Sequence, residues 1–199
     1  MTLVVATSNA GKLREFARIL GMSAVIRSMA DAGFNAEVAE PGPGYVDNAL
    51  AKAAAVSAAL DVPVIADDSG IEIDALHGWP GPRSARWLGP AANDEERVLA
   101  LLAEVQRRSP TNRRARFVCV VALCRPGAEP VTARGESLGT IVTPSGANGF
   151  GYDPIFLSDD LGITFASASA EEKDRVSHRA RALRCLCGSE AVHGGRGAA

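Results

Sequence analysis

A ten-residue run from Val64 to Ile73, Val-Ile-Ala-Asp-Asp-Ser-Gly-Ile-Glu-Ile, places two adjacent carboxylates directly after an apolar strand pattern. Neighbouring strand residues point to opposite faces, so Asp67 and Asp68 cannot serve one environment, and at least one is expected to leave the core for a polar site. Ser69-Gly70 is expected to break the strand. Carboxylates at a strand tip are where α/β proteins hold a hard metal ion against a phosphate, although a solvated loop is the plainer interpretation.

The bulk composition predicts one domain, with room for two lobes, in a chain of 199 residues. The 21 basic and 23 acidic residues give a net charge of −2, without a long basic tract, which argues against nucleic acid as the main partner. No apolar run approaches the roughly 18 residues of a membrane span, and there is no signal-peptide pattern. A cytoplasmic protein with no membrane partner is expected.

The cysteine and histidine spacings argue against zinc. The four cysteines match no zinc-ribbon or thioredoxin-like motif, and the three histidines show no His-x-x-x-His spacing. We interpret the cysteines as small apolar residues in a reducing compartment. They occupy positions 119, 124, 185 and 187.

Hydrophobic periodicity predicts strands that alternate with helices. Leu13, Phe16, Ala17 and Leu20 form one helix face, and Asn93 with Glu96 resembles a capping box. Residues 71–76 either continue the strand that carries the aspartates or start its partner. The pattern indicates a mixed α/β sheet in two lobes. Strands are expected near 3–7, 62–66, 117–124 and 131–142, and further helices at 46–60 and 175–187.

Three further segments carry groups suited to a nucleotide. Thr7 to Lys12 joins a strand to a helix and offers hydroxyl, amide and ammonium groups where free N–H groups favour an anion. It is not a Walker A loop, and a helix cap with a surface lysine is the alternative. Phe150 to Pro154 has two aromatics that could stack on a base, or forms a structural turn. Ser177-His178-Arg179, after Lys173, gathers hydrogen-bond donors at a helix.

These segments in this order, with Ser84-Ala85-Arg86 between them, resemble the inosine triphosphate pyrophosphatases, the Ham1-like enzymes that act on non-canonical purine nucleotides. The resemblance covers residue 3 to about residue 187. It implies an ITPase-like (Ham1/Maf-type) mixed twisted sheet with flanking helices in an elongated, two-lobed domain of residues 1–188, and residues 189–199 are expected to be a flexible tail. It also implies a homodimer that hydrolyses ITP, dITP and XTP to the monophosphate and pyrophosphate with Mg²⁺.

The resemblance further assigns roles to residues. Asp68 would bind the metal and take the proton of the attacking water, while Asp67 supports the site or binds a further ion. Glu40 aligns best with the family's metal-binding glutamate, and Glu37 is the possible substitute. The implied substrate-binding residues are Thr7, Ser8, Asn9, Ala10, Gly11, Lys12, Ser69, Arg86, Phe150, Gly151, Tyr152, Asp153, Lys173, His178 and Arg179.

Three other functions are weighed against this one. A Maf-like pyrophosphatase for pyrimidine triphosphates is disfavoured by the segments Phe150 to Asp153 and Ser177 to Arg179. A non-catalytic nucleotide-binding regulator has no need of an acidic metal cluster. A haloacid-dehalogenase-type phosphatase requires an Asp-x-Asp nucleophile pattern, which Asp67-Asp68-Ser69 lacks.

Overall fold

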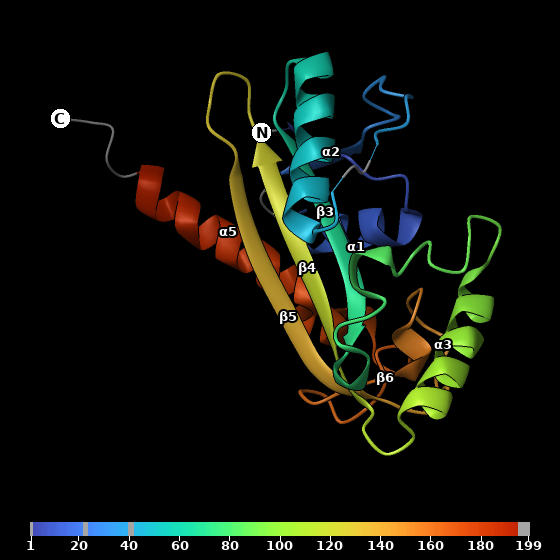
Figure 1. Ribbon diagram of the computed structural model, residues 1–199. Coiled ribbons are helices and arrows are strands. Elements are labelled where there is room, and N and C mark those ends of the chain that lie inside the picture. The colour runs from blue at the N-terminus through green and yellow to red at the C-terminus, as the bar shows by residue number, and fades with distance from the viewer. Residues whose placement is uncertain (1, 22–23, 40–41, 195–199) are drawn as a thin grey trace. The chain divides into compact units, whose positions relative to one another are not determined.

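The computed structural model describes residues 2–21, 24–39 and 42–194, which contain a six-stranded mixed sheet of order β2-β1-β3-β4-β5-β6 (Figure 1). β1 pairs in parallel with β2 and with β3, whereas β5 and β6 pair antiparallel. The predicted mixed α/β class is therefore confirmed. The strands are β1 (Thr2–Val5), β2 (Val25–Ser28), β3 (Val64–Ile73), β4 (Arg114–Cys124), β5 (Val131–Ile141) and β6 (Phe156–Ser158).

The helices lie near their predicted ranges except at the C-terminal end, although Ala17, predicted to share one apolar helix face with Phe16, is exposed. The predicted capping box of Asn93 and Glu96 is confirmed at the start of α3. In place of one helix over 175–187 there are two, because the chain turns to an extended conformation at Ser177. The helices are α1 (Ala10–Leu20), α2 (Tyr45–Leu60), α3 (Asp94–Arg108), α4 (Ala170–Val176) and α5 (His178–Gly194).

The chain divides into two compact units, in keeping with the two predicted lobes. The first unit comprises the described residues of 1–68, 119–135 and 179–199, and the second comprises 69–118 and 136–178. Strands β3, β4 and β5 each contribute residues to both units.

In the first unit, helices cover both faces of the strands. Phe16 of α1 and Leu183 of α5 pack with Val5, Ile65 and other alternate strand residues in one apolar cluster. The intervening strand residues are also buried, as are Ala49, Ala53 and Val56 of α2. Figure 1 shows α2 on the side of the strands opposite to α5. Such two-sided cover explains why the strand sequences are almost continuously apolar.

The core of the second unit is rich in aromatic rings. Phe117, Phe156 and Phe165 pack with ring centroids 4.6 to 5.9 Å apart, and Val98, Leu101 and Val105 of α3 belong to the same cluster. Within the described ranges, no helix is both long enough and apolar enough to cross a membrane. Of the four cysteines, Cys119 and Cys124 are buried as small apolar residues would be, whereas Cys185 and Cys187 are exposed.

Candidate functional site

Strand β3 does not break at Ser69-Gly70 but runs through both residues to Ile73. The expectation that an aspartate leaves the core is also wrong, since Asp67 is 1% exposed and Asp68 is 4% exposed. Both carboxylates remain buried because each has polar partners within the first unit. As the strand geometry requires, those partners differ for the two aspartates.

Asp67 is held as a carboxylate by two cations. Its Oδ2 atom lies 3.1 Å from Lys12 Nζ and 2.9 Å from Arg179 Nη2, and Cys119 Sγ lies 3.8 Å away. Burial alone would raise the pKa of Asp67, but the positive charges of Lys12 and Arg179 outweigh burial and hold the pKa well below its usual range. Asp67 therefore stays ionised throughout the physiological range of pH.

Glu15 completes this group of charges, and the sequence analysis did not identify it. The carboxylate of Glu15, on α1, accepts a hydrogen bond from Arg179 Nη1, and Glu15 is only 2% exposed. With Lys12, Asp67 and Arg179 it forms a cluster of two positive and two negative side chains. The available signal was a carboxylate directly before Phe16, one helical turn after Lys12.

Asp68 has a different environment. Its Oδ2 atom accepts a hydrogen bond of 2.9 Å from Asn48 Nδ2 of α2, and Asn48 is fully buried. Burial raises the pKa of Asp68, which the positive charge of Lys52 and the Asn48 hydrogen bond only partly oppose. A carboxylate with a raised pKa binds a proton more readily, which suits a general base.

The described donor atoms fit a magnesium ion bound partly by its substrate. Mg²⁺ prefers oxygen ligands and is commonly held by one or two carboxylates together with phosphates and water. Asp68 supplies such a carboxylate, and Asp67 Oδ1 is a buried oxygen with no hydrogen-bond partner in the described part of the chain. Glu37 is exposed, and Glu40 lies outside the described residues. No group of three His, Cys, Asp or Glu side chains suited to a metal occurs among the described residues.

The loop from Thr7 to Lys12 forms the predicted helix cap, but Lys12 is not the surface lysine of that interpretation, because its ammonium pairs with buried Asp67. Asn9 caps α1, because its Oδ1 atom accepts the Lys12 N–H at 3.0 Å, and the Asn9 N–H bonds to Thr7 Oγ1 at 3.2 Å. Ser8, Asn9 and Ala10 are exposed, whereas Gly11 is buried. The first N–H groups of an 11-residue helix and the Lys12 ammonium thus belong to one short segment.

The second unit gathers most of the predicted base-recognition residues. Asp153 Oδ2 accepts hydrogen bonds from Phe150 N–H at 2.9 Å and from Lys173 Nζ at 2.5 Å. The same ammonium lies 4.9 Å from the centroid of the Phe150 ring. His178 stacks on Phe117, with ring centroids 4.7 Å apart and planes 11° apart.

Two predicted binding residues have other roles in the structure. The guanidinium of Arg179 is fully buried in the first unit, where its two terminal nitrogens bind Glu15 and Asp67. Tyr152 is 5% exposed and belongs to the core of the second unit. Ser69 is half-buried, and Arg86 is exposed in the segment after Ser84.

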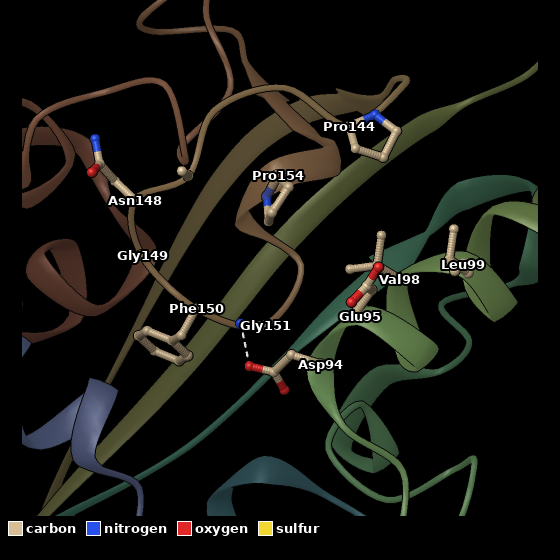
Figure 2. A pocket seen from close by; sticks show the side chains of 11 residues that line it. Asp94, Glu95, Val98, Leu99, Pro144, Asn148, Gly149, Phe150, Gly151 and Pro154 are labelled. Atoms are coloured by element: carbon tan, nitrogen blue, oxygen red, sulfur yellow. Dashed lines mark hydrogen bonds between the residues drawn. The ribbon is translucent and has the colours of Figure 1, made fainter.

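A hollow of about 300 Å³ lies beside the Phe150 turn (Figure 2). Phe150 and Gly151 line it together with the first turns of α3, and the Gly151 N–H donates to Asp94 Oδ2 at 2.8 Å. Asp153, Lys173 and His178 are not among its lining residues. The full lining is Asp94, Glu95, Val98, Leu99, Pro144, Ala147, Asn148, Gly149, Phe150, Gly151 and Pro154.

The model of the Ham1 family matches residues 3–188. This chain belongs to the Ham1 family. The Ham1 chain is 45% identical over 185 residues to a dITP/XTP pyrophosphatase of Shouchella clausii, with 92% of this chain and 93% of the relative covered. Its fold is similar to that of the Staphylococcus aureus Ham1 protein, with a TM-score of 0.84, 36% identity and coverage of 98% and 100% of the two chains.

A second solved Ham1 relative carries an activity in its name. It is the nucleoside-triphosphatase / dITP/XTP pyrophosphatase of Mycobacterium abscessus, which matches this chain with a TM-score of 0.73 and 41% identity. The match covers 94% of this chain and 98% of the relative. The family and the mixed α/β fold predicted from sequence motifs are therefore both confirmed.

Proposed function

We propose that this Ham1 protein is a nucleoside-triphosphate pyrophosphatase that hydrolyses ITP, dITP and XTP to the monophosphate and pyrophosphate with Mg²⁺. The observation that carries the proposal is the buried Asp67-Asp68 pair, in which Asp67 contacts the cations of Lys12 and Arg179 while its neighbour Asp68 accepts a hydrogen bond from Asn48. Environments of this kind divide acid, base and structural roles at catalytic sites. The names of the bacterial relatives support the same substrates.

In the proposed reaction, the first unit supplies the phosphate chemistry. Lys12 and the N–H groups at the start of α1 bind phosphate oxygens and neutralise their charge, as does the exposed Arg86 of the second unit. Asp68 orients the water and accepts its proton as the water attacks phosphorus. Asp68, with Glu40 or Glu37, would hold Mg²⁺, which would supply positive charge to neutralise the phosphate oxygens. Asp67 fixes Lys12 and Arg179 in place.

The second unit recognises the base in this proposal. Phe150 stacks on the purine, while Lys173 and His178 donate to the oxygen at position 6 of hypoxanthine or xanthine. Adenine presents an amino donor at that position, which would leave buried donors unpaired. Asp153 holds Lys173 in position through their 2.5 Å contact. Arg179 is assigned to the charge cluster, because Glu15 and Asp67 occupy its terminal nitrogens.

We expect the specificity constant for ITP and XTP to exceed that for ATP by a large factor. Sites built to hydrogen-bond a substrate group reject analogues by up to about 10⁴–10⁵. The measurement is the release of pyrophosphate and of orthophosphate from each nucleotide with Mg²⁺, and orthophosphate as the product would indicate a phosphatase. Equal specificity constants for ITP and ATP would contradict the proposed base site. Preferential cleavage of pyrimidine triphosphates would favour the Maf-like alternative, and binding of nucleotide without turnover would favour a non-catalytic regulator.

Lys12→Ala is expected to raise the Michaelis constant for ITP by about tenfold to a hundredfold, since hydrogen bonds to charged groups are worth about 1.5–3 kcal/mol. Binding of the monophosphate product, which has fewer phosphates to contact, should weaken less. Arg14→Ala is the matched control, because Arg14 is an exposed cation two residues further along α1. Unchanged kinetics in Lys12→Ala would reduce the loop to a helix cap.

The remaining proposals concern the form in which the protein acts. Residues 1–188 are proposed to be the catalytic domain, a boundary that the family match to residues 3–188 supports. The flexible tail expected over 189–199 is wrong for residues 189–194, which continue helix α5. A homodimer in the cytoplasm, where nucleoside triphosphates are kept, is proposed on the family resemblance. Sedimentation equilibrium of the full chain tests the dimer.

A further inference from the structure

Tyr152 makes two hydrogen bonds that a base-stacking residue would not need. Its hydroxyl accepts from Trp87 Nε1 at 2.8 Å and donates to the backbone carbonyl of Ser84 at 2.7 Å. Burial raises the pKa of Tyr152 to about 12, so the hydroxyl keeps its proton. The Tyr152 ring itself packs in the core cluster of the second unit.

The segment that receives this bond is fixed against β3. Ser84 Oγ accepts the Ile71 N–H at 2.9 Å and donates to the Gly81 carbonyl at 2.6 Å. The approach is close, because a Cβ atom added at Gly70 would lie 2.0 Å from the Gly81 oxygen. The Ser84 segment is therefore held directly on the strand that also carries Asp68, and Arg86 follows two residues later.

The turn that carries the Tyr152 hydroxyl is held independently. Its two preceding residues donate their backbone N–H groups to carboxylates. The Phe150 N–H donates to Asp153, and the Gly151 N–H donates to Asp94, as Figure 2 shows for the second bond. The Tyr152 hydroxyl consequently forms a hydrogen bond between two segments, each of which is also held by hydrogen bonds of its own. Trp87 orients the hydroxyl, because its Nε1–H donates to the Tyr152 oxygen, and the hydroxyl proton then points to the Ser84 carbonyl.

We propose that Tyr152, oriented by Trp87, is a positioning residue that sets the distance from the Phe150–Asp153 turn to the Ser84–Arg86 segment. This inference rests on the proposed function, in which the turn recognises the base and Arg86 neutralises the phosphates. Tyr152 then acts without touching the nucleotide. Correct spacing places the reacting phosphorus when base and phosphates are bound together, and small misplacements of reacting groups lower turnover strongly.

Tyr152→Phe tests the proposal, since it removes the hydroxyl and keeps the ring. We expect kcat for ITP to fall about tenfold to a hundredfold with the Michaelis constant within about threefold, as misplacement of reacting groups would produce. Separate binding of inosine, which has no phosphate for Arg86, and of pyrophosphate, which has no base for the turn, should stay within about twofold when measured by calorimetry. A stacking role predicts unchanged kcat, because phenylalanine stacks as well as tyrosine, and that result would overturn the proposal.

Trp87→Phe supplies the second arm. Alone it should lower kcat less than Tyr152→Phe does, and in the Tyr152→Phe background it should lower kcat no further, because its partner is already gone. Additive losses of kcat, or parallel losses of inosine and pyrophosphate binding, would overturn the positioning role. If Tyr152→Phe fails to fold, an unchanged kcat in Trp87→Phe would overturn the proposal instead. Failure of the wild-type protein to release pyrophosphate from ITP would instead contradict the proposed function itself.

Discussion

Asp68→Asn is expected to lower turnover of ITP by about a hundredfold or more while leaving the thermal midpoint near that of the wild type. The loss follows from removal of a general base, which contributes about 10²–10⁴-fold. The fold should tolerate the change because asparagine keeps the volume and can still accept the hydrogen bond from Asn48. Burial raises the pKa of Asp68, so its ionised form costs stability above its unfolded pKa, and the neutral amide avoids that cost.

The measurement is steady-state pyrophosphate release with Mg²⁺, alongside calorimetric melting. Asp61→Asn is the matched control, since Asp61 is an exposed aspartate of the same unit in a left-handed conformation that asparagine also adopts. The control should match the wild type in both assays. Turnover close to normal in Asp68→Asn would remove Asp68 from the mechanism.

Arg179→Ala is expected to cause the largest loss of stability, about 3–5 kcal/mol, because it leaves the carboxylates of Glu15 and Asp67 buried without their shared cation. At roughly 2–4 °C per kcal/mol for a chain of this size, the thermal midpoint should fall by about 6–20 °C. Arg114→Ala is the comparison, because Arg114 also pairs with a carboxylate, that of Asp159, but is 46% exposed. Its loss should cost below about 1 kcal/mol.

Activity measurements on the same variant separate two roles for Arg179. As part of the charge cluster, Arg179 should affect ITP and ATP alike, so Arg179→Ala should lower both activities and leave their ratio unchanged. A guanidinium that hydrogen-bonds the base would be needed for ITP much more than for ATP. Its removal would therefore lower the ratio of ITP activity to ATP activity. A lower ratio of ITP to ATP activity, with the thermal midpoint of the wild type, would therefore indicate that Arg179 binds the base.

The sequence predicted features that depend on local pattern. The strand near 117–124 and the helix start at Asn93 with Glu96 were both predicted, because each signal lies within a few residues. The short strand β2 was missed. Its residues Val25–Ser28 are partly exposed at the sheet edge and include Arg27, so neither an apolar run nor a clear alternation marks it.

Long-range partners explain the remaining errors. At least one of Asp67 and Asp68 was expected to leave the core, because the sequence did not reveal that Lys12, Arg179 and Asn48 would contact them there. Arg179 lies 112 residues from Asp67, and Tyr152 lies 65 residues from Trp87. The order of the motifs named the candidate site residues, but only the fold shows which partners their side chains contact.

The interleaving of the two units along the chain limits how this protein can be dissected. The first unit draws on three separate stretches of the chain and the second on two, so no single cut releases either one whole. A fragment ending at Asp68 would lack the strand and helix residues that pack with Val5 and Ile65. Domain exchange or expression of half-genes would thus yield incomplete cores, and engineered variants of this enzyme are better sought by point substitution or by circular permutation at exposed turns.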